Sequence, residues 1–453
     1  MLQRWRPVLR YLPPYKRTIG AGLAGLVAAS ALRAAAPLVW REPLSVLEVS
    51  WRAGEAIDMG LVVALALSAI AVTLCAAGAS FLKRHRLIGV SRRVEADLRS
   101  DLFRHIQHLP QSTLDGMRTG DLMSRATADV EAVRMALGPA LMYLTDSLLA
   151  IAVVLPLMFL INVELTLYIL APLALIGVGL FFIAPRIHRA SRAVQDKLAD
   201  ISAFAQESFA GARVVKTFAM EDREQRTMNA LSDTYLDSNV GLGRIRGLTF
   251  GGIGLLTGAG LVLILWIGGG LYADGRLTIA DLLTFEMYVI MLTWPMMAFG
   301  WVFSLIQRGQ AGLDRISYVF DLPPEKSAAQ PCPALRGEIE FRNLSFAYNG
   351  RPVLEDISLH VPAGSTLGIV GATGSGKSTL LALLPRLYEA PPGTILMDGR
   401  DLTEIPLADL RGAMALVPQE AFLFSKTIRQ NITFGRADAG PAVQDQAVED
   451  AQL

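Results

Sequence analysis

Long apolar runs dominate the first 306 residues of the chain. Six runs, each near the ~20 residues that a helix needs to cross a bilayer, cover approximately residues 18–40, 57–82, 138–161, 163–184, 247–272 and 282–306. The third and fourth runs are separated only by a polar turn at Asn162 and Glu164. We therefore predict a membrane domain of six transmembrane helices, with both of its ends on the same side of the membrane.

The two long connections Lys83–Arg134 and Arg186–Arg246 keep a helical pattern. Mostly apolar residues recur there at helical spacing: Val94, Leu98, Leu102, Ile106 and Leu109 in the first, and Ile201, Phe204, Ala205, Ser208 and Phe209 in the second. We expect helical extensions of the spans that leave the membrane and turn back, with turns at Gly116, Gly120 and Gly211. The alternative is a pair of ordinary surface helices.

After Asp321 the pattern changes. A Pro-rich linker at residues 321–336 separates the membrane domain, residues 1–320, from a region at 337–453 in which apolar runs are short. Six of these runs are expected to be strands: 337–342, 344–348, 357–361, 366–370, 394–399 and 413–417. A helix is expected to start near Leu380. Strands that alternate with helices favour a soluble α/β domain.

Composition agrees with a membrane protein and excludes other classes. Hydrophobic residues make up 52% of the chain and charged residues only 18%, which is too apolar for a soluble protein of this length. The formal net charge of +1 gives no general attraction for nucleic acid. Cys75 and Cys332 lie far apart and suggest two free thiols, and the five scattered His show no metal-ligand spacing.

Positive charge predicts the orientation in the membrane. Both long connections are rich in Arg and Lys. Of the three connections on the opposite side, the first holds Arg41 and Arg52, the second holds no basic residue, and the third holds Arg276. Basic connections stay in the cytoplasm. We therefore expect a multi-pass protein of the plasma or inner membrane, with the N-terminus and the C-terminal domain on the cytoplasmic side. The basic, aromatic residues 1–17 are expected to lie along the membrane surface.

Three ionisable residues, Arg33, Asp146 and Glu286, fall inside the predicted spans. A charge within the membrane commonly lines a pathway or a cavity. Each could instead pair with another residue in a structural role, and the sequence does not decide between these two interpretations.

The most specific chemical signal is the stretch Gly371-Ala372-Thr373-Gly374-Ser375-Gly376-Lys377-Ser378-Thr379. It fits the phosphate-binding pattern G-x-x-x-x-G-K-[ST], between an apolar run and the start of a helix. The glycines allow a tight turn whose N–H groups face phosphate oxygens. Lys377 supplies positive charge to the phosphates, and the Ser378 hydroxyl can ligate Mg²⁺. The alternative is a Gly/Ser-rich surface loop.

Six spans, two long helical connections and a phosphate-binding loop together resemble a half-transporter of the ABC exporter type. The resemblance covers the whole chain. It includes two stretches that look like the surroundings of the family's two coupling helices, residues 118–130 and 209–218. The stretches Tyr11–Tyr15 and Met287–Met296 look most like multidrug-resistance-like half-transporters, which often work as heterodimers.

The resemblance also assigns two residues outside the loop. Tyr348 occupies the place of the aromatic residue that stacks on adenine, and Gln419 in Val417-Pro418-Gln419-Glu420 matches the glutamine that reaches Mg²⁺ and the attacking water. The implied cofactors are ATP and Mg²⁺. The implied partners are a second half-transporter, with a heterodimer favoured over a homodimer, membrane lipid and a small lipophilic substrate. Nucleic acid is not among them.

The sequence departs from the family after Gln419. Up to Leu453 it shows no L-S-G-G-Q signature, no Walker B strand with a catalytic Glu and no switch His, so no catalytic residue is located. The region 337–453 is therefore interpreted as the N-terminal part of a nucleotide-binding domain. Two functions remain: ATP-dependent export of a drug or lipid by a dimer, or a non-catalytic short form that only pairs with a full-length half.

Overall fold

The computed structural model describes all residues except 1, 55–58, 329–331, 420–421, 437 and 453. Contacts divide the chain into two compact units. The first comprises residues 1–107 and 117–323, and the second comprises residues 108–116 and 324–453. A short segment between two membrane helices thus belongs with the C-terminal unit.

The first unit contains six long helices that are apolar enough to cross a membrane. They span Pro13–Ala53, Met59–Gln107, Thr119–Ile161, Val163–Ala210, Glu221–Ala273 and Ile279–Phe320. This confirms the predicted architecture of six membrane helices followed by a small mixed α/β region. The elements of this unit are α1 (Leu2–Leu9), η1 (Pro13–Tyr15), α2 (Lys16–Ala53), α3 (Met59–Gln107), α5 (Thr119–Ser124), η2 (Arg125–Asp129), α6 (Val130–Met135), η3 (Ala136–Ala140), α7 (Leu141–Ile161), α8 (Val163–Ala210), α9 (Ala212–Thr217), α10 (Glu221–Leu263), η4 (Ile264–Gly268), α11 (Gly269–Ala273) and α12 (Ile279–Phe320).

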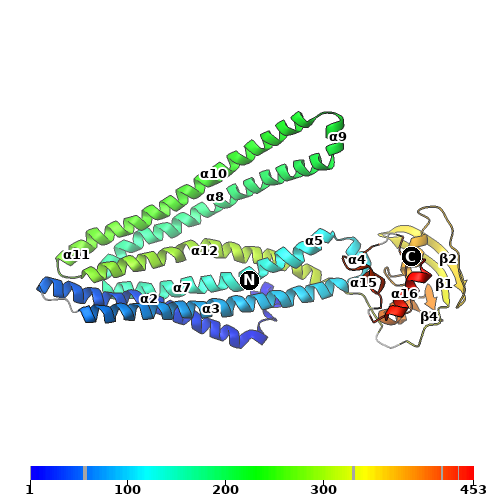
Figure 1. The fold of residues 1–453 in the computed structure, drawn as a ribbon, viewed down its shortest axis with the longest axis horizontal. Coiled ribbons are helices and arrows are strands. Elements are labelled where there is room, and N and C mark those ends of the chain that lie inside the picture. Colours follow the sequence, from blue (N-terminus) through cyan, green and yellow to red (C-terminus); the bar gives the residue numbers. More distant parts are fainter. Residues whose placement is uncertain (1, 55–58, 329–331, 420–421, 437, 453) are drawn as a thin grey trace. The chain divides into compact units, whose positions relative to one another are not determined.

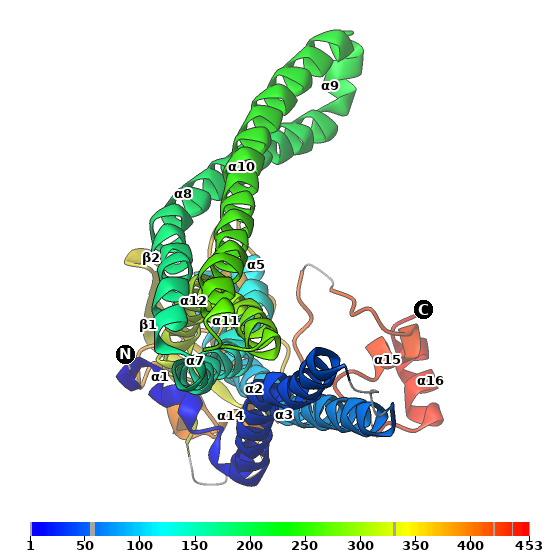
Figure 2. The same ribbon diagram turned by 90° about the vertical axis from the view of Figure 1, so that its left-hand side faces the viewer.

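The predicted helical extensions are present. α3 continues to Gln107, and α8 and α10 form a long hairpin closed by the short helix α9 (Figures 1 and 2). Gly211 lies at the predicted turn, between α8 and α9, and Gly116 caps the short helix α4 (Gln111–Asp115). The turn expected at Gly120 is wrong, because this residue lies inside α5. The turn comes just before it, where Arg118 has extended backbone and caps α5.

The core of the first unit lies where α7, α8 and α12 meet. Phe285 and Tyr288 of α12 are fully buried there beside Met158 and Leu165. Tyr288 places its hydroxyl 2.9 Å from the carbonyl oxygen of Ala34 and donates a hydrogen bond to it. α12 also approaches η2 closely, since a Cβ at Gly312 would lie 2.9 Å from the Asp129 carbonyl oxygen. Small residues therefore allow close contact between helices, as is common in membranes.

The second unit is built on a four-stranded antiparallel sheet. Its strands are β1 (Ile339–Tyr348), β2 (Arg351–Val361), β3 (Ile395–Met397) and β4 (Arg400–Asp401), in the order β2-β1-β3-β4. Its helices are α4 (Gln111–Asp115), α13 (Lys377–Leu383), η5 (Leu402–Glu404), α14 (Leu407–Gly412), α15 (Ile428–Ile432) and α16 (Pro441–Asp450). The core contains Phe341, Leu344, Leu383 and Leu410.

Two of the predicted strands are wrong. The segments 366–370 and 413–417 carry no strand, and Val370 and Val417 are 96% and 92% exposed. A strand needs a hydrogen-bonded neighbour, and the sheet of the described residues does not extend to either segment. The runs predicted at 337–342 and 344–348 form the single strand β1, with register shifts between Phe341 and Leu344. The runs at 357–361 and 394–399 are strands in β2 and β3.

Candidate nucleotide site

The loop Gly371–Thr379 ends in α13, which begins at Lys377, three residues before the start expected near Leu380. Gly374 and Gly376 have φ values of 84° and 87°, in the left-handed region that favours glycine. A Cβ at Gly376 would lie 2.7 Å from Cδ2 of Leu354 in β2, so a larger residue would push the loop from the sheet. The two glycines thus meet a backbone requirement and a packing requirement.

Lys377 folds back over the loop. Its Nζ donates to the carbonyl oxygens of Gly371 and Ala372, each at 2.8 Å, and lies 3.4 Å from the Ser375 hydroxyl. Within the described part of the chain, no hydrogen bond or ion pair joins this ammonium to a carboxylate. The positive charge therefore sits among neutral oxygens at the mouth of the loop, which fits an anionic ligand such as a phosphate.

The remaining predicted ligands around the loop are Ala372, Thr373, Ser375, Ser378 and Thr379. Ser378 is the second residue of α13 and is exposed, so its hydroxyl is free to face a cation held by phosphates. Among the described residues no group of three or more His, Cys, Asp or Glu could hold a metal ion. A metal at this site would therefore depend on the nucleotide for most of its ligands.

Tyr348 lies at the end of β1 in a small aromatic cluster. Its ring meets those of Phe346 and Tyr388 edge to face, with centroids 4.9 Å apart in both cases. The Tyr388 hydroxyl donates to Asp115 Oδ2 of α4 at 2.6 Å. This hydrogen bond, helped by partial burial, raises the pKa of Tyr388 above its usual range.

Sequence reasoning missed both Tyr388 and Asp115. They lie 273 positions apart in the chain, and neither belongs to a recognisable pattern. The pair links the segment 108–116 to the residue predicted to stack on adenine.

Gln419 is exposed, and its neighbours 420–421 lie outside the described residues. Over the part of the chain that the structure describes, no hydrogen bond joins it to the loop. Lys377 and Ser378 are consecutive residues at the start of α13, whereas the assignments of Gln419 and of the adenine-stacking Tyr348 stay predictions.

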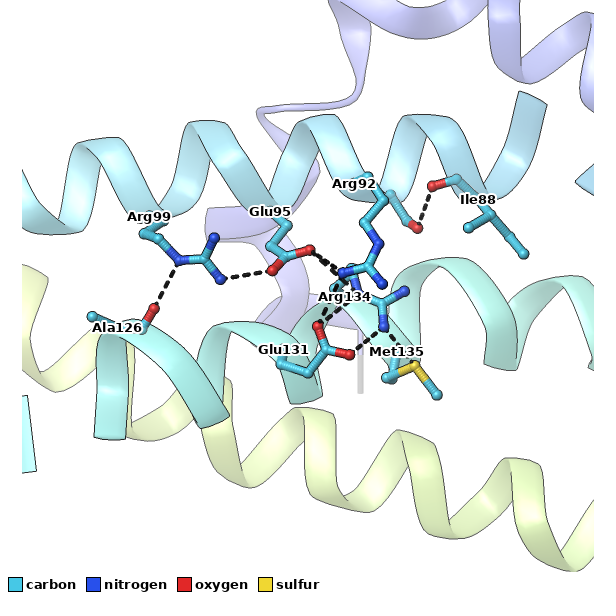
Figure 3. Close-up of polar contacts among 9 residues, drawn as sticks. Ile88, Arg92, Glu95, Arg99, Ala126, Glu131, Arg134 and Met135 are labelled. Carbon is cyan, nitrogen blue, oxygen red and sulfur yellow. Dashed lines mark hydrogen bonds and ion pairs between the residues drawn. The ribbon is translucent and has the colours of Figure 1, made fainter. Parts of the chain in front are cut away.

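A network of ion pairs in the first unit fixes α3 to α6 (Figure 3). Arg134 lies between Glu95, at 3.3 Å, and Glu131, whose Oε2 accepts from its Nε at 2.8 Å. Arg92 and Arg99 bind the two oxygens of Glu95 from one turn on either side, at 3.0 and 2.6 Å. The hydrogen bond from Arg134 lowers the pKa of Glu131.

Two of the three predicted intramembrane charges form a pair. Arg33 Nη2 lies 3.3 Å from Asp146 Oδ1. A third residue, Lys83, joins them, with its Nζ 2.9 Å from the same oxygen. Lys83 was not predicted because it directly follows an apolar run rather than interrupting it. Glu286 is half-buried in α12, with no ion pair among the described residues.

Comparison with known proteins agrees with these features. The model of the ABC transporter transmembrane region matches residues 19–296, and the ABC transporter model matches residues 354–452. A probable multidrug resistance ABC transporter ATP-binding/permease protein of Bacillus subtilis is 33% identical over 83% of this chain and 65% of its own length. A fatty acid ABC transporter ATP-binding/permease protein of Mycobacterium bovis is 30% identical over 97% of this chain and 70% of its own length.

An ATP-dependent lipid A-core flippase of Methylococcus capsulatus is 32% identical over 96% of this chain and 72% of its own length. The chain thus spans just under two thirds of the Bacillus relative and somewhat more of the other two. Both the membrane domain and the loop-bearing region are matched, in the same order. The chain therefore belongs to the ABC transporter family, as a half-transporter of the exporter type.

Proposed function

We propose that this chain acts in the ATP-dependent export of a lipophilic drug or lipid, as one half of a dimeric transporter. The observation that carries the proposal is a phosphate-binding loop whose lysine ammonium contacts only neutral oxygens among the described residues, in the same chain as a six-helix membrane domain. The relatives described as a multidrug transporter, a fatty acid transporter and a lipid A-core flippase support an apolar or amphiphilic substrate.

In this proposal the nucleotide lies over the loop. The N–H groups of residues 371–379 and the Lys377 ammonium bind the phosphates, and Tyr348 stacks on adenine. Ser378 and Gln419 bind Mg²⁺, which neutralises the phosphates and orients them when it is bound. The domain boundaries that go with this assignment are 1–320, 321–336 and 337–453. The N-terminus and the nucleotide domain face the cytoplasm.

A second half-transporter is needed to complete the pathway. The α8–α10 hairpin supports this part of the proposal, because large apolar side chains along it are exposed. They include Leu198, Phe209, Val214, Phe218, Leu236 and Val240. These residues lie beyond the apolar runs that are predicted to cross the membrane, where exposed apolar side chains fit a contact with another protein. We favour a heterodimer because the sequence resembles multidrug-resistance-like half-transporters.

The alternative is a non-catalytic membrane protein that pairs with a full-length half. Two observations favour it. Among the described residues, no hydrogen bond joins Gln419 to the loop, and no carboxylate forms a hydrogen bond or an ion pair with Lys377. In that case the chain would contribute at most a nucleotide-binding surface to a partner.

ATPase activity in lipid separates the two functions. The purified chain is assayed alone and with a full-length half-transporter from the same source, with Lys377→Ala as the matched control. Export predicts an activity that Lys377→Ala reduces at least ~100-fold, since the loop lysine acts directly on the transferred phosphoryl group. A rate that requires the partner and Lys377 supports a catalytic heterodimer. Absence of a Lys377-dependent rate in both samples contradicts the export proposal for this polypeptide.

A further inference from the structure

Three donors meet a single carboxylate oxygen in the membrane domain. Ser30 Oγ and Arg33 Nη2 of α2 lie 3.2 and 3.3 Å from Asp146 Oδ1 of α7. Lys83 Nζ of α3 lies 2.9 Å from the same atom. The cluster therefore joins three membrane helices through one acceptor, which we call the Asp146 cluster.

The charges of the Asp146 cluster do not balance. Two cations face one carboxylate, and the next residue on α3, Arg84, adds a third positive charge nearby. Lys83 is buried, with a side chain only 6% exposed. An uncompensated charge in apolar surroundings is costly. One cation would be enough for a structural ion pair with Asp146. The second cation leaves an excess of positive charge that another anion could neutralise.

The two cations differ in access. α2 packs tightly over Lys83, since a Cβ at Gly25 would lie 3.1 Å from the Lys83 backbone nitrogen. Lys83 therefore contacts Asp146 from a position that α2 covers. The Arg33 side chain is 44% exposed. Within the described residues its only hydrogen-bonding partner is Asp146. A guanidinium has five N–H donors in a planar fork, so most of the Arg33 donors remain available.

We propose that the Asp146 cluster binds the anionic group of an amphiphile, a carboxylate or a phosphate, through Arg33 and Lys83. Asp146 and Ser30 hold the two cations in position, and a bound anion supplies a second negative charge beside Arg33 and Lys83. The planar Arg33 fork suits bidentate binding of either group. Exposed apolar residues lie close to the cluster in the chain, Val27 on α2 and Phe81 on α3, and offer surface for a hydrocarbon chain.

This inference rests on the proposed export function, because it names the chemical class of the substrate. Lys83 directly follows the apolar run 57–82, whereas Ser30, Arg33 and Asp146 lie within the apolar runs 18–40 and 138–161, so the cluster borders apolar surface. A substrate with an anionic head and an apolar tail would satisfy both parts of this environment. A neutral lipophile would satisfy only the apolar part.

Equilibrium binding tests the proposal without ATP. The chain is placed in nanodiscs of phosphatidylcholine, and the probes are hexadecanoate, hexadecyl phosphate and methyl hexadecanoate, each radiolabelled and corrected for empty discs. We expect one or both anions to bind about tenfold more tightly than the methyl ester, the effect of one charge-assisted hydrogen bond. The two anions show whether the cluster prefers a carboxylate or a phosphate.

Three variants separate binding from structure. Arg33→Gln is expected to weaken binding of the anions about tenfold and to leave the ester unchanged. Asp146→Asn removes the competing carboxylate and is expected to strengthen anion binding. Arg276→Gln is the control, because it breaks the exposed ion pair between Arg276 and Glu164 at 3.1 Å, which lies outside the cluster. It should change the binding of neither the anions nor the ester. Thermal melting of each variant identifies any loss of fold.

Equal binding of anions and ester by the wild-type chain would overturn the inference. So would an Arg33→Gln variant that folds and keeps the anion preference, because the cluster would then only be a structural link. Failure of export is seen separately, in the Lys377-dependent ATPase assay. An active exporter without anion preference refutes the inference alone, whereas anion binding without ATPase activity refutes the export function alone.

Discussion

At the scale of single residues, Tyr388 connects two parts of the C-terminal unit. Its hydroxyl binds Asp115, and its ring packs against Tyr348. These two contacts have different consequences, because one is a hydrogen bond at a partly exposed site and the other supports the ring that is proposed to stack on adenine. Two substitutions can separate them.

Tyr388→Phe removes the hydrogen bond and keeps the ring. We expect it to lower the stability of the unit by about 1 kcal/mol or less, since the bond is partly exposed, and to change the Kd for ATP less than twofold. Tyr388→Ala also removes the ring and is expected to weaken ATP binding several-fold. Thermal melting and fluorescence titration with a labelled ATP measure both effects. An equal loss of ATP affinity in both variants would assign the role to the hydroxyl instead.

Glu131 gives a residue-scale dependence on pH. Hydrogen bonding from Arg134, with Arg92 and Arg99 nearby, lowers its pKa below the usual value of 4.5. A carboxyl group with a lowered pKa stabilises the folded state above its usual pKa, and this contribution is lost as pH falls below that value towards the lowered pKa. The contact between α3 and α6 should therefore weaken in acid.

Hydrogen–deuterium exchange can measure this weakening. After correction for the intrinsic exchange rate, amides of α6 should lose protection more steeply than amides of α12 as the pH falls below 4.5. Glu131→Gln should already show reduced protection at pH 7 and a flatter pH dependence. An unchanged pH profile in this variant would show that Glu131 is not the titrating group.

At the scale of elements, glycine positions on α12 decide how closely it can approach η2. A Cβ at Gly312 would lie 2.9 Å from the backbone oxygen of Asp129, an atom that cannot move aside without the helix. A Cβ at Gly300 of the same helix would have no atom within 4 Å. The two positions therefore form a matched pair.

We expect Gly312→Ala to destabilise the membrane domain by roughly 1–3 kcal/mol, as overpacking does. Gly300→Ala should be neutral or slightly stabilising, because alanine favours a helix. The measurement is the thermal unfolding midpoint of each variant in detergent or nanodiscs. Equal midpoints for the two variants would mean that η2 and α12 can move apart without loss of stability.

The elements that the sequence predicts well are those whose cause is local. Each membrane helix follows from an uninterrupted apolar run, and β1 and β2 follow from short runs beside turn residues such as Asn349 and Gly350. The segment at 366–370 was predicted as a strand for the same local reason, and it is not one. A strand also depends on a neighbour that its own residues do not reveal.

Contacts between residues that are distant in the chain also limit what the sequence can predict. The loop glycines and Lys377 could be located from their spacing alone, because neighbouring residues form that site. Lys83 and Asp146 are 63 positions apart, and Tyr388 and Asp115 are 273 apart. Only packing of helices and strands brings these side chains together, so no spacing in the sequence could predict them.

At the scale of the whole molecule, the distribution of charge along the long hairpin predicts its orientation in the membrane. From residue 185 to Ala210, α8 continues for about 39 Å beyond its apolar run, at 1.5 Å per residue. This extension carries several Arg and Lys residues, whereas the connection between α11 and α12 carries only Arg276. If basic segments remain in the cytoplasm, α9 lies inside the cell and the turn at Asp274 lies outside.

Cysteine labelling tests this orientation directly. Cys75 and Cys332 are first replaced by serine, and a single cysteine is then introduced as Asp274→Cys or Lys216→Cys, both at exposed positions. A membrane-impermeant maleimide should label the Asp274→Cys variant in intact cells. It should label Lys216→Cys, in α9, only after the cells are opened, because the bilayer separates the reagent from that thiol. The chain without cysteines controls for background, and the opposite labelling pattern would reverse the proposed orientation and place the nucleotide site on the side of the membrane that lacks ATP.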